Sequence, residues 1–247
     1  MKRKLIVLLT LVLIVGFGLM AQDYYANKSF KESEKGSRST WARMKFKVIA
    51  GPTQRHKADW DWHAHPVGDL NMISHIRKNT SANLKMDWGI ADLNKPKEVF
   101  SFPFIFMHAE MEPIFSQENL DTLREYLLRG GFLYIEDCVY KNGQEDTFFQ
   151  SMMRHMQAIL PEATIKKLDK DHEVFNCYYK FPQGMPYIQG VKGEHFGLFG
   201  VYYKGRIVAM LSPTDLHCAW VGAWFGKHTT KESYKMGLNL YVYAMTH

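Results

Sequence analysis

The sequence has few cysteines and lacks the short motifs of several common enzyme classes. Its three cysteines are too few for a disulfide scaffold, and their odd number leaves at least one free thiol. One disulfide can form among them, but the sequence does not identify its partners. Glycine-rich phosphate-binding motifs are absent after the first predicted strand, as are HExxH, paired CxxC and GxSxG motifs. These absences argue against nucleotide binding, a zincin site and a hydrolase nucleophile elbow.

The excess of positive over negative charge is also small beyond the N-terminus. The net charge of +6 includes three charges from Lys2, Arg3 and Lys4. No arginine-rich run, zinc-finger spacing or aromatic-basic RNA-binding motif is present. We therefore expect no nucleic-acid partner. The composition, with 46% hydrophobic and 23% charged residues, is that of an ordinary globular domain.

The N-terminal residues 1–21 have the pattern of a signal peptide. Three basic residues precede an apolar run from Leu5 to Met20, with cleavage expected after Ala21. The alternative is an uncleaved anchor, although the run is slightly shorter than the about 20 residues of a membrane span. We expect an exported protein, periplasmic or associated with the cell envelope, that contacts the membrane only through this segment if it is uncleaved. A polar linker, 22–40, would precede one domain over 41–247.

Apolar strands alternate with helical patterns along this domain. Strands are predicted at 46–49, 84–88, 102–107, 132–135, 163–168, 198–203 and 206–211. Helices are predicted at 66–78, 117–128, 149–160 and 234–245, and Ser116 is a suitable N-cap for the second of them. The order predicts an α/β fold with a doubly wound, mostly parallel sheet, helices on both faces, a late β-hairpin and a C-terminal helix.

The segment Gly130–Cys138 organises this arrangement. The two glycines suit a helix C-terminus and a tight turn. Phe132–Ile135 is continuously apolar, as in a strand covered on both faces. Two acids and a thiol follow directly. Because ligands bind outside the carboxyl ends of strands in open α/β sheets, we expect a site there.

Six residues are predicted to line this carboxyl edge. They are Asp59, Trp60, His108, Glu136, Asp137 and His172. Asp137 would accept hydrogen bonds or ligate an ion, and the two histidines would titrate near neutral pH. Large aromatic residues also occur in nearby loops and suit ligand or protein contacts, although some would belong to the core: Trp60, Trp62, Trp220 and Trp224.

Two reactive groupings are alternatives to a plain binding surface. Cys138 is a candidate nucleophile with His172 as its base, but the acids before it would raise its pKa. His63 and His65 would share a face of an extended segment and are candidate metal ligands. Asp59, Asp61, His108, Asp137 and His172 could join them. A second candidate group is His217, Cys218 and His228, for which structural roles are the commoner explanation.

Several segments together resemble the bacterial domain-of-unknown-function family 4159. They are Asp59-Trp60, Phe102–His108, Leu127–Cys138, Asp171–Phe175, Phe181–Pro186 and Met236–Ala244. The resemblance covers about Met44 to the C-terminus and implies a flavodoxin-like or class I glutamine amidotransferase-like fold in a membrane-attached or exported protein. It implies no established activity. The sequence departs from the family pattern at Ala109, where the family often has glycine.

We expect a noncatalytic ligand-binding or protein-interaction module of the cell envelope, whose partner is an envelope protein or a small ligand. The alternative is a hydrolase or amidotransferase-like enzyme that uses Cys138 or a divalent metal as cofactor. An enzyme requires the candidate groups to converge within a few ångströms, whereas a binding surface allows them to be dispersed.

Overall fold

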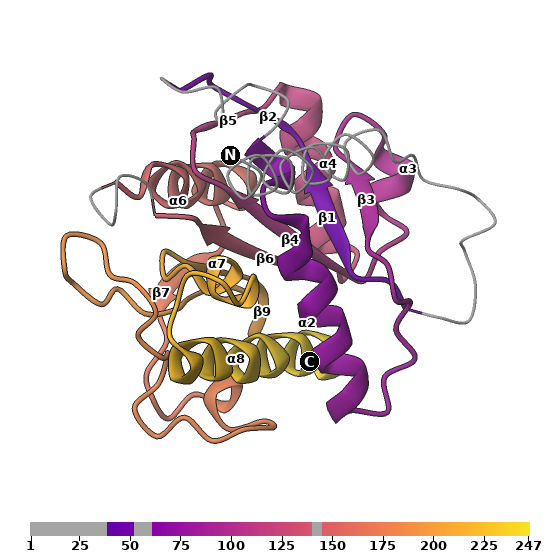
Figure 1. Cartoon of the computed structure of the whole chain (residues 1–247). Coiled ribbons are helices and arrows are strands. Elements are labelled where there is room, and N and C mark those ends of the chain that lie inside the picture. The colour runs from indigo at the N-terminus through magenta and orange to yellow at the C-terminus, as the bar shows by residue number, and fades with distance from the viewer. Residues whose placement is uncertain (1–38, 52–60, 140–144) are drawn as a thin grey trace, which may run out of the picture.

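The protein is built around a seven-stranded, mostly parallel sheet (Figure 1). The computed structural model describes residues 39–51, 61–139 and 145–247. The strand order is β3-β1-β4-β6-β9-β8-β7. Five adjacent strands are parallel: β3 (Gly89–Asp92), β1 (Ala42–Lys45), β4 (Phe104–Ala109), β6 (Phe132–Asp137) and β9 (Arg206–Ser212). The antiparallel strands β8 (Phe199–Tyr203) and β7 (Thr164–Lys167) extend the sheet. A separate antiparallel pair comprises β2 (Lys47–Val48) and β5 (Pro113–Ile114).

Helices cover both faces of the sheet, as predicted (Figure 1). One layer contains α3 (Pro96–Val99), α4 (Gln117–Leu128) and α6 (Thr147–Ile159). The other contains α2 (Pro66–Asn79), α7 (Leu216–Trp220) and α8 (Lys227–Thr246). Two short 3-10 helices are η3 (Asp61–His63) and η4 (Glu173–Phe175). Over the described ranges, none of the helices has both the length and the apolar character required to span a membrane.

The connection from α4 to β6 forms as the sequence predicts. Ser116 caps α4, since its side chain accepts from the Asn119 N–H and the Asn119 side chain accepts from the Ser116 N–H, both at 3.2 Å. Gly130 has a φ of 100°, which favours glycine. A Cβ on Gly131 would lie 2.3 Å from the buried Tyr126 ring. The two glycines are therefore required for different reasons, one conformational and one steric.

Two predicted strands were misplaced. The first strand was predicted at 46–49, where only the short β2 (Lys47–Val48) forms; the first strand of the main sheet is β1 (Ala42–Lys45), which contains a fully buried arginine, Arg43. The second was predicted at 84–88, but β3 is Gly89–Asp92. Position 89 of this strand is a glycine because the Phe102 ring packs directly against its backbone. A Cβ atom at this position would lie only 2.9 Å from the ring. Both errors reflect partners that are distant in sequence.

The parallel strands bring several loops to one edge. The chain passes from β1 to β3 on one side and then to β4 on the other side of β1, so the direction of winding reverses between β1 and β4. The loops after β1, β4, β6 and β9 meet at the carboxyl edge. Four predicted features lie outside the described residues: the signal peptide at 1–21, residues 22–38 of the linker, and the edge residues Asp59 and Trp60.

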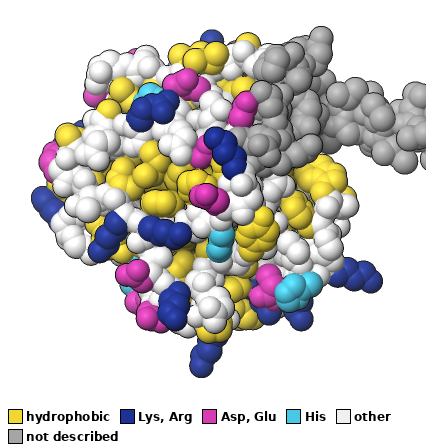
Figure 2. All heavy atoms as spheres, turned by 90° about the vertical axis from the view of Figure 1, so that its left-hand side faces the viewer, with side chains coloured by type: hydrophobic (Ala, Val, Ile, Leu, Met, Phe, Trp, Pro, Cys, Tyr) yellow, Lys and Arg dark blue, Asp and Glu magenta, His cyan; other side chains and the backbone are white. Residues whose placement is uncertain are grey.

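The surface carries charges of both signs. On the face shown in Figure 2, lysine, arginine, aspartate and glutamate side chains are interspersed around a central group of hydrophobic side chains. Of the tryptophans predicted to form an aromatic surface, Trp62 and Trp220 are buried in the core. Trp224 is 54% exposed. The structure therefore leaves one of the three described members of that group at the surface.

Candidate functional site

Two cysteines meet at the carboxyl edge. Cys138 directly follows β6, and its N–H donates to the Ala109 carbonyl at the end of β4 (3.2 Å). Cys218 lies on α7, after β9. Both are buried and reduced, and their Sγ atoms are 2.8 Å apart. Residues 80 positions apart in the sequence thus form one sulfur pair.

An acid lies against both sulfurs. Asp215 precedes α7 in a left-handed conformation with a φ of 65°, and its carboxylate interacts with both thiols and accepts the hydrogen bond of Cys218. Its Oδ1 atom is buried and has no hydrogen-bond partner in the described part of the chain. Burial raises the pKa of Asp215 to about 6, although the thiol hydrogen bonds oppose this change.

The thiols are protonated at neutral pH in this arrangement. The hydrogen bond to Cys218 is the largest cause that raises the pKa of Cys138 well above its usual value, followed by burial and the charge of Asp215. The hydrogen bond from Cys138 lowers the pKa of Cys218, but burial and Asp215 outweigh it and raise the pKa to about 12. Because nucleophilic attack requires a thiolate, this environment does not favour Cys138 as a nucleophile.

His65 completes a group of three potential metal ligands. It lies on the connection after β1, immediately before α2, with a left-handed φ of 53°. A ring nitrogen of His65 and the Sγ atoms of Cys138 and Cys218 all lie within 4.8 Å of one another. The half-buried His65 ring packs edge-on against Trp224, with ring centroids 4.5 Å apart. Three separate segments at the sheet edge therefore bring donor atoms within 4.8 Å of one another.

A buried polar network holds the His65 loop in place. Arg43 on β1 donates to the Ala64 carbonyl (3.0 Å) and forms an ion pair with Asp69 of α2 (3.4 Å). Asp69 also accepts from the Trp41 indole (2.9 Å) and contacts His217 Nε2 (3.0 Å). The network thus joins the loop before α2 to α7, which carries Cys218.

The titration of this network is governed by burial. Burial raises the pKa of Asp69, while the Arg43 guanidinium and the Trp41 hydrogen bond oppose this change. Burial also lowers the pKa of His217 far below its usual value, and the Arg43 charge adds to the effect. His217 is therefore neutral, and its contact with Asp69 is a hydrogen bond without a second positive charge.

The two acids at the end of β6 point into the protein. Glu136 accepts from the backbone N–H groups of Leu216 and His217, each at 2.7 Å, and from the Tyr134 hydroxyl at 3.1 Å. Burial raises the pKa of Glu136 to about 8. Asp137 accepts from the Phe149 N–H in the first turn of α6 (2.7 Å). Both acids lie at the predicted edge, but they anchor the starts of two helices.

The predicted histidines separate into three locations. His108 is fully buried on β4, 3.4 Å from Arg43 and packed against the His217 ring. His63 is buried in η3, and burial, together with Arg43 and Lys45, lowers its pKa to about 3. It is not a member of the ligand group that contains His65. The structure thus splits the predicted His63 and His65 pair.

His172 does not reach the carboxyl edge. It precedes η4 and packs against Tyr243, which in turn contacts Phe132 at the start of β6. The connection after β7 carries it toward the opposite end of the strands. Burial lowers the pKa of His172. The predicted Cys138 and His172 pairing is therefore wrong.

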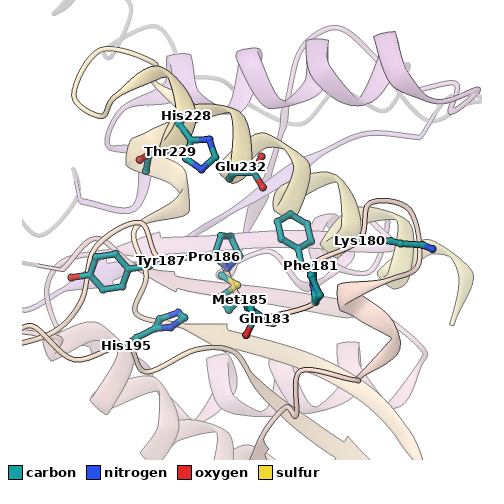
Figure 3. A pocket seen from close by; sticks show the side chains of 12 residues that line it. Lys180, Phe181, Gln183, Met185, Pro186, Tyr187, His195, His228, Thr229 and Glu232 are labelled. Atoms are coloured by element: carbon teal, nitrogen blue, oxygen red, sulfur yellow. The ribbon is translucent and has the colours of Figure 1, made fainter.

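A surface cavity lies beside the start of α8. It has a volume of about 470 Å³ and is lined by residues 180–187, His195, His228, Thr229 and Glu232 (Figure 3). Tyr187 packs edge-on against His195, with centroids 5.6 Å apart. His228, which was grouped with His217 and Cys218 in the sequence, is exposed and lines this cavity. The cavity contains none of the six predicted edge residues.

Comparison with known proteins adds a family assignment. The family described as Domain of unknown function (DUF4159) matches residues 47–245. The chain belongs to the DUF4159 family. The match confirms the family that the sequence segments indicated. Among curated proteins, none matches this DUF4159 chain.

Sequence reasoning named each member of this ligand group as a candidate but did not bring the three together. It placed Cys138 at the edge and named His65, but it paired Cys218 with His217 and His228. Asp215 was not considered. One signal was available: Asp215 and Cys218 follow a predicted strand closely, as Cys138 does.

Proposed function

We propose that the DUF4159 domain binds one soft transition-metal ion, such as Zn²⁺, at the carboxyl edge of its sheet through Cys138, Cys218 and His65. The observation that carries this proposal is the convergence of their three donor atoms within 4.8 Å. Two thiolates and one imidazole form a common donor set for zinc, and such soft ligands favour zinc or copper(I) over magnesium or calcium.

The geometry needs only a small adjustment. In a tetrahedral site with Zn–S bonds of roughly 2.3 Å, the sulfurs would be about 3.8 Å apart. The observed separation of 2.8 Å must therefore widen by about 1 Å. The Asp215 carboxylate lies against both sulfurs but is not a member of the three-residue ligand group, so these residues would leave the fourth position of the ion open. An ion would also offset the negative charge of this carboxylate and two thiolates.

The supporting residues hold the ligands before an ion binds. Glu136 fixes the first turn of α7, and therefore Cys218, through two backbone hydrogen bonds. Arg43 fixes the backbone next to His65 through the Ala64 carbonyl. Partners of this kind orient metal ligands and contribute to affinity.

The strand order and the position of the site in the sheet support a binding role at this edge. The five parallel strands, numbered by sequence, have the order 2-1-3-4-5, which is the flavodoxin-like order, and His65 follows the strand where the winding reverses. We therefore propose that the fold is flavodoxin-like. We also propose that the protein is exported, because its N-terminal residues have the pattern of a signal peptide. The sequence led us to expect either an envelope protein or a small ligand as the partner. The site favours a small ligand, which would be the metal ion itself.

The test is a titration of the reduced, metal-free full chain with Co²⁺, which reports cysteine ligation through sulfur-to-cobalt charge-transfer absorption. We expect about one ion per chain. Cys138→Ala, Cys218→Ala and His65→Ala should each weaken binding by at least about tenfold, a loss typical of removing a metal-site group. Cys177→Ala and His228→Gln are matched controls outside the group and should bind as the wild type does. Unchanged binding in the folded Cys138→Ala/Cys218→Ala variant would overturn the proposal.

A further inference from the structure

We propose that Cys138 and Cys218 also form a reversible disulfide, and that this bond expels the metal ion, so that the site alternates between a metal-binding dithiol and a metal-free disulfide. This inference rests on the proposed metal site. It adds a modification of the same two sulfurs and a means of controlling the ion.

The distance between the two Sγ atoms lies between that of a disulfide and that of two thiolates bound to one zinc ion. A disulfide has an S–S length of about 2.05 Å, and two ligands of a tetrahedral zinc ion lie about 3.8 Å apart. The Sγ atoms of Cys138 and Cys218, at 2.8 Å, are about 0.8 Å from the first distance and about 1 Å from the second. Small side-chain movements reach either state without separating β6 from α7.

The two states exclude each other for a chemical reason. A sulfur in a disulfide carries no negative charge and is no longer a thiolate ligand. Without Cys138 and Cys218, only His65 remains of the three-member ligand group. One imidazole beside one carboxylate is too few ligands for a structural zinc site. Formation of the bond therefore removes the ion.

The third cysteine has a different environment. The Cys177 thiol lies near the carbonyls of Val174 (3.7 Å) and Asn239 (3.4 Å), between η4 and α8. It is half-buried and is not a member of the ligand group. Cys177 therefore serves as an internal reference thiol, which should stay reduced when the other two are oxidised.

The oxidation balances with a disulfide reagent as the electron acceptor. In the zinc-loaded chain both cysteines are thiolates, and one of them attacks the reagent and releases its first thiol, which leaves a mixed disulfide. The second cysteine attacks that bond, forms the Cys138–Cys218 bond and releases the second thiol. The two metal-bound thiolates lose two electrons, the reagent is reduced to two thiols that take up two protons from solvent, and the ion leaves as a dication. An exported protein would meet such oxidants in an oxidising compartment.

The experiment equilibrates the zinc-loaded full chain in anaerobic glutathione buffers of increasing oxidised fraction. Released zinc is measured with a chromophoric chelator, and thiols are alkylated and counted by intact mass. We expect zinc release to coincide with a fall from three alkylated thiols to one and with a linked Cys138–Cys218 peptide. Reduction should restore binding. Cys177→Ala should release zinc at the same oxidised fraction of glutathione as the wild type, whereas Cys218→Ser should form no internal disulfide.

The outcomes separate this inference from the metal site. If reduced protein binds zinc but all three thiols stay alkylatable in every buffer, the switch is wrong and the metal site stands. If the disulfide forms and zinc stays bound, the switch is also wrong. If the reduced protein takes up no zinc, the proposed function fails and the coupling fails with it.

Discussion

Replacing Arg43 with methionine is expected to destabilise the protein by about 3–5 kcal/mol. Arg43 and Asp69 have fully buried side chains and form an ion pair at 3.4 Å. Methionine fills similar space but leaves the Asp69 carboxylate without this guanidinium, and removal of one partner of a buried pair costs about this much. The Ala64 carbonyl also loses its donor. Because Ala64 precedes His65, cobalt affinity should fall as well.

Urea denaturation of the reduced, metal-free protein measures this effect, and a double-mutant cycle isolates the pair. Arg43→Met and Asp69→Asn should each destabilise, and the double variant should be less destabilised than their sum by at least about 1 kcal/mol. Arg129→Met removes an exposed ion pair with Glu125 and should cost less than about 1 kcal/mol. The reasoning would be refuted if the effects of the two buried substitutions were additive. It would also be refuted if Arg43→Met lowered the free energy of unfolding by less than Arg129→Met does.

Three further changes test the supporting structure. Glu136→Ala removes the acceptor of two backbone N–H groups and a hydroxyl, and it should cost about 3–6 kcal/mol by urea denaturation. Gly131→Ala should cost about 1–3 kcal/mol by the same assay, because its Cβ would meet the buried Tyr126 ring at 2.3 Å; an unchanged midpoint would contradict this packing. Burial lowers the pKa of His75 below 6.5, so the unfolded chain takes up the proton first as pH falls. His75→Phe, which retains a ring against Tyr234, should therefore lose less stability than wild type between about pH 7 and about pH 5.

The fold was predictable where local chemistry decides it. The Ser116 cap, the Gly130-Gly131 turn and the apolar run of β6 each have a cause within a few residues, and all three predictions are confirmed. β1 was missed because Arg43 looks polar in sequence, yet Asp69 on a different element pairs with it in the core. Such pairings depend on packing between distant segments, which a periodicity search does not detect.

The site was predictable in position and not in composition. The carboxyl end of β6 was identified from the abrupt change of polarity at Glu136. The use of Glu136 and Asp137 as anchors of helices could not be read from sequence, because their donors come from α7 and from the start of α6. The pairing of Cys138 with Cys218 likewise joins residues 80 positions apart.

The most direct test of the metal site is X-ray absorption spectroscopy at the zinc K-edge of the reduced, reconstituted full chain. The account predicts two sulfur ligands at about 2.3 Å and at least one imidazole nitrogen at about 2.0 Å. The Cys138→Ala/Cys218→Ala variant should lose the sulfur shell. A zinc shell that contains only oxygen and nitrogen ligands in the wild type would contradict the account.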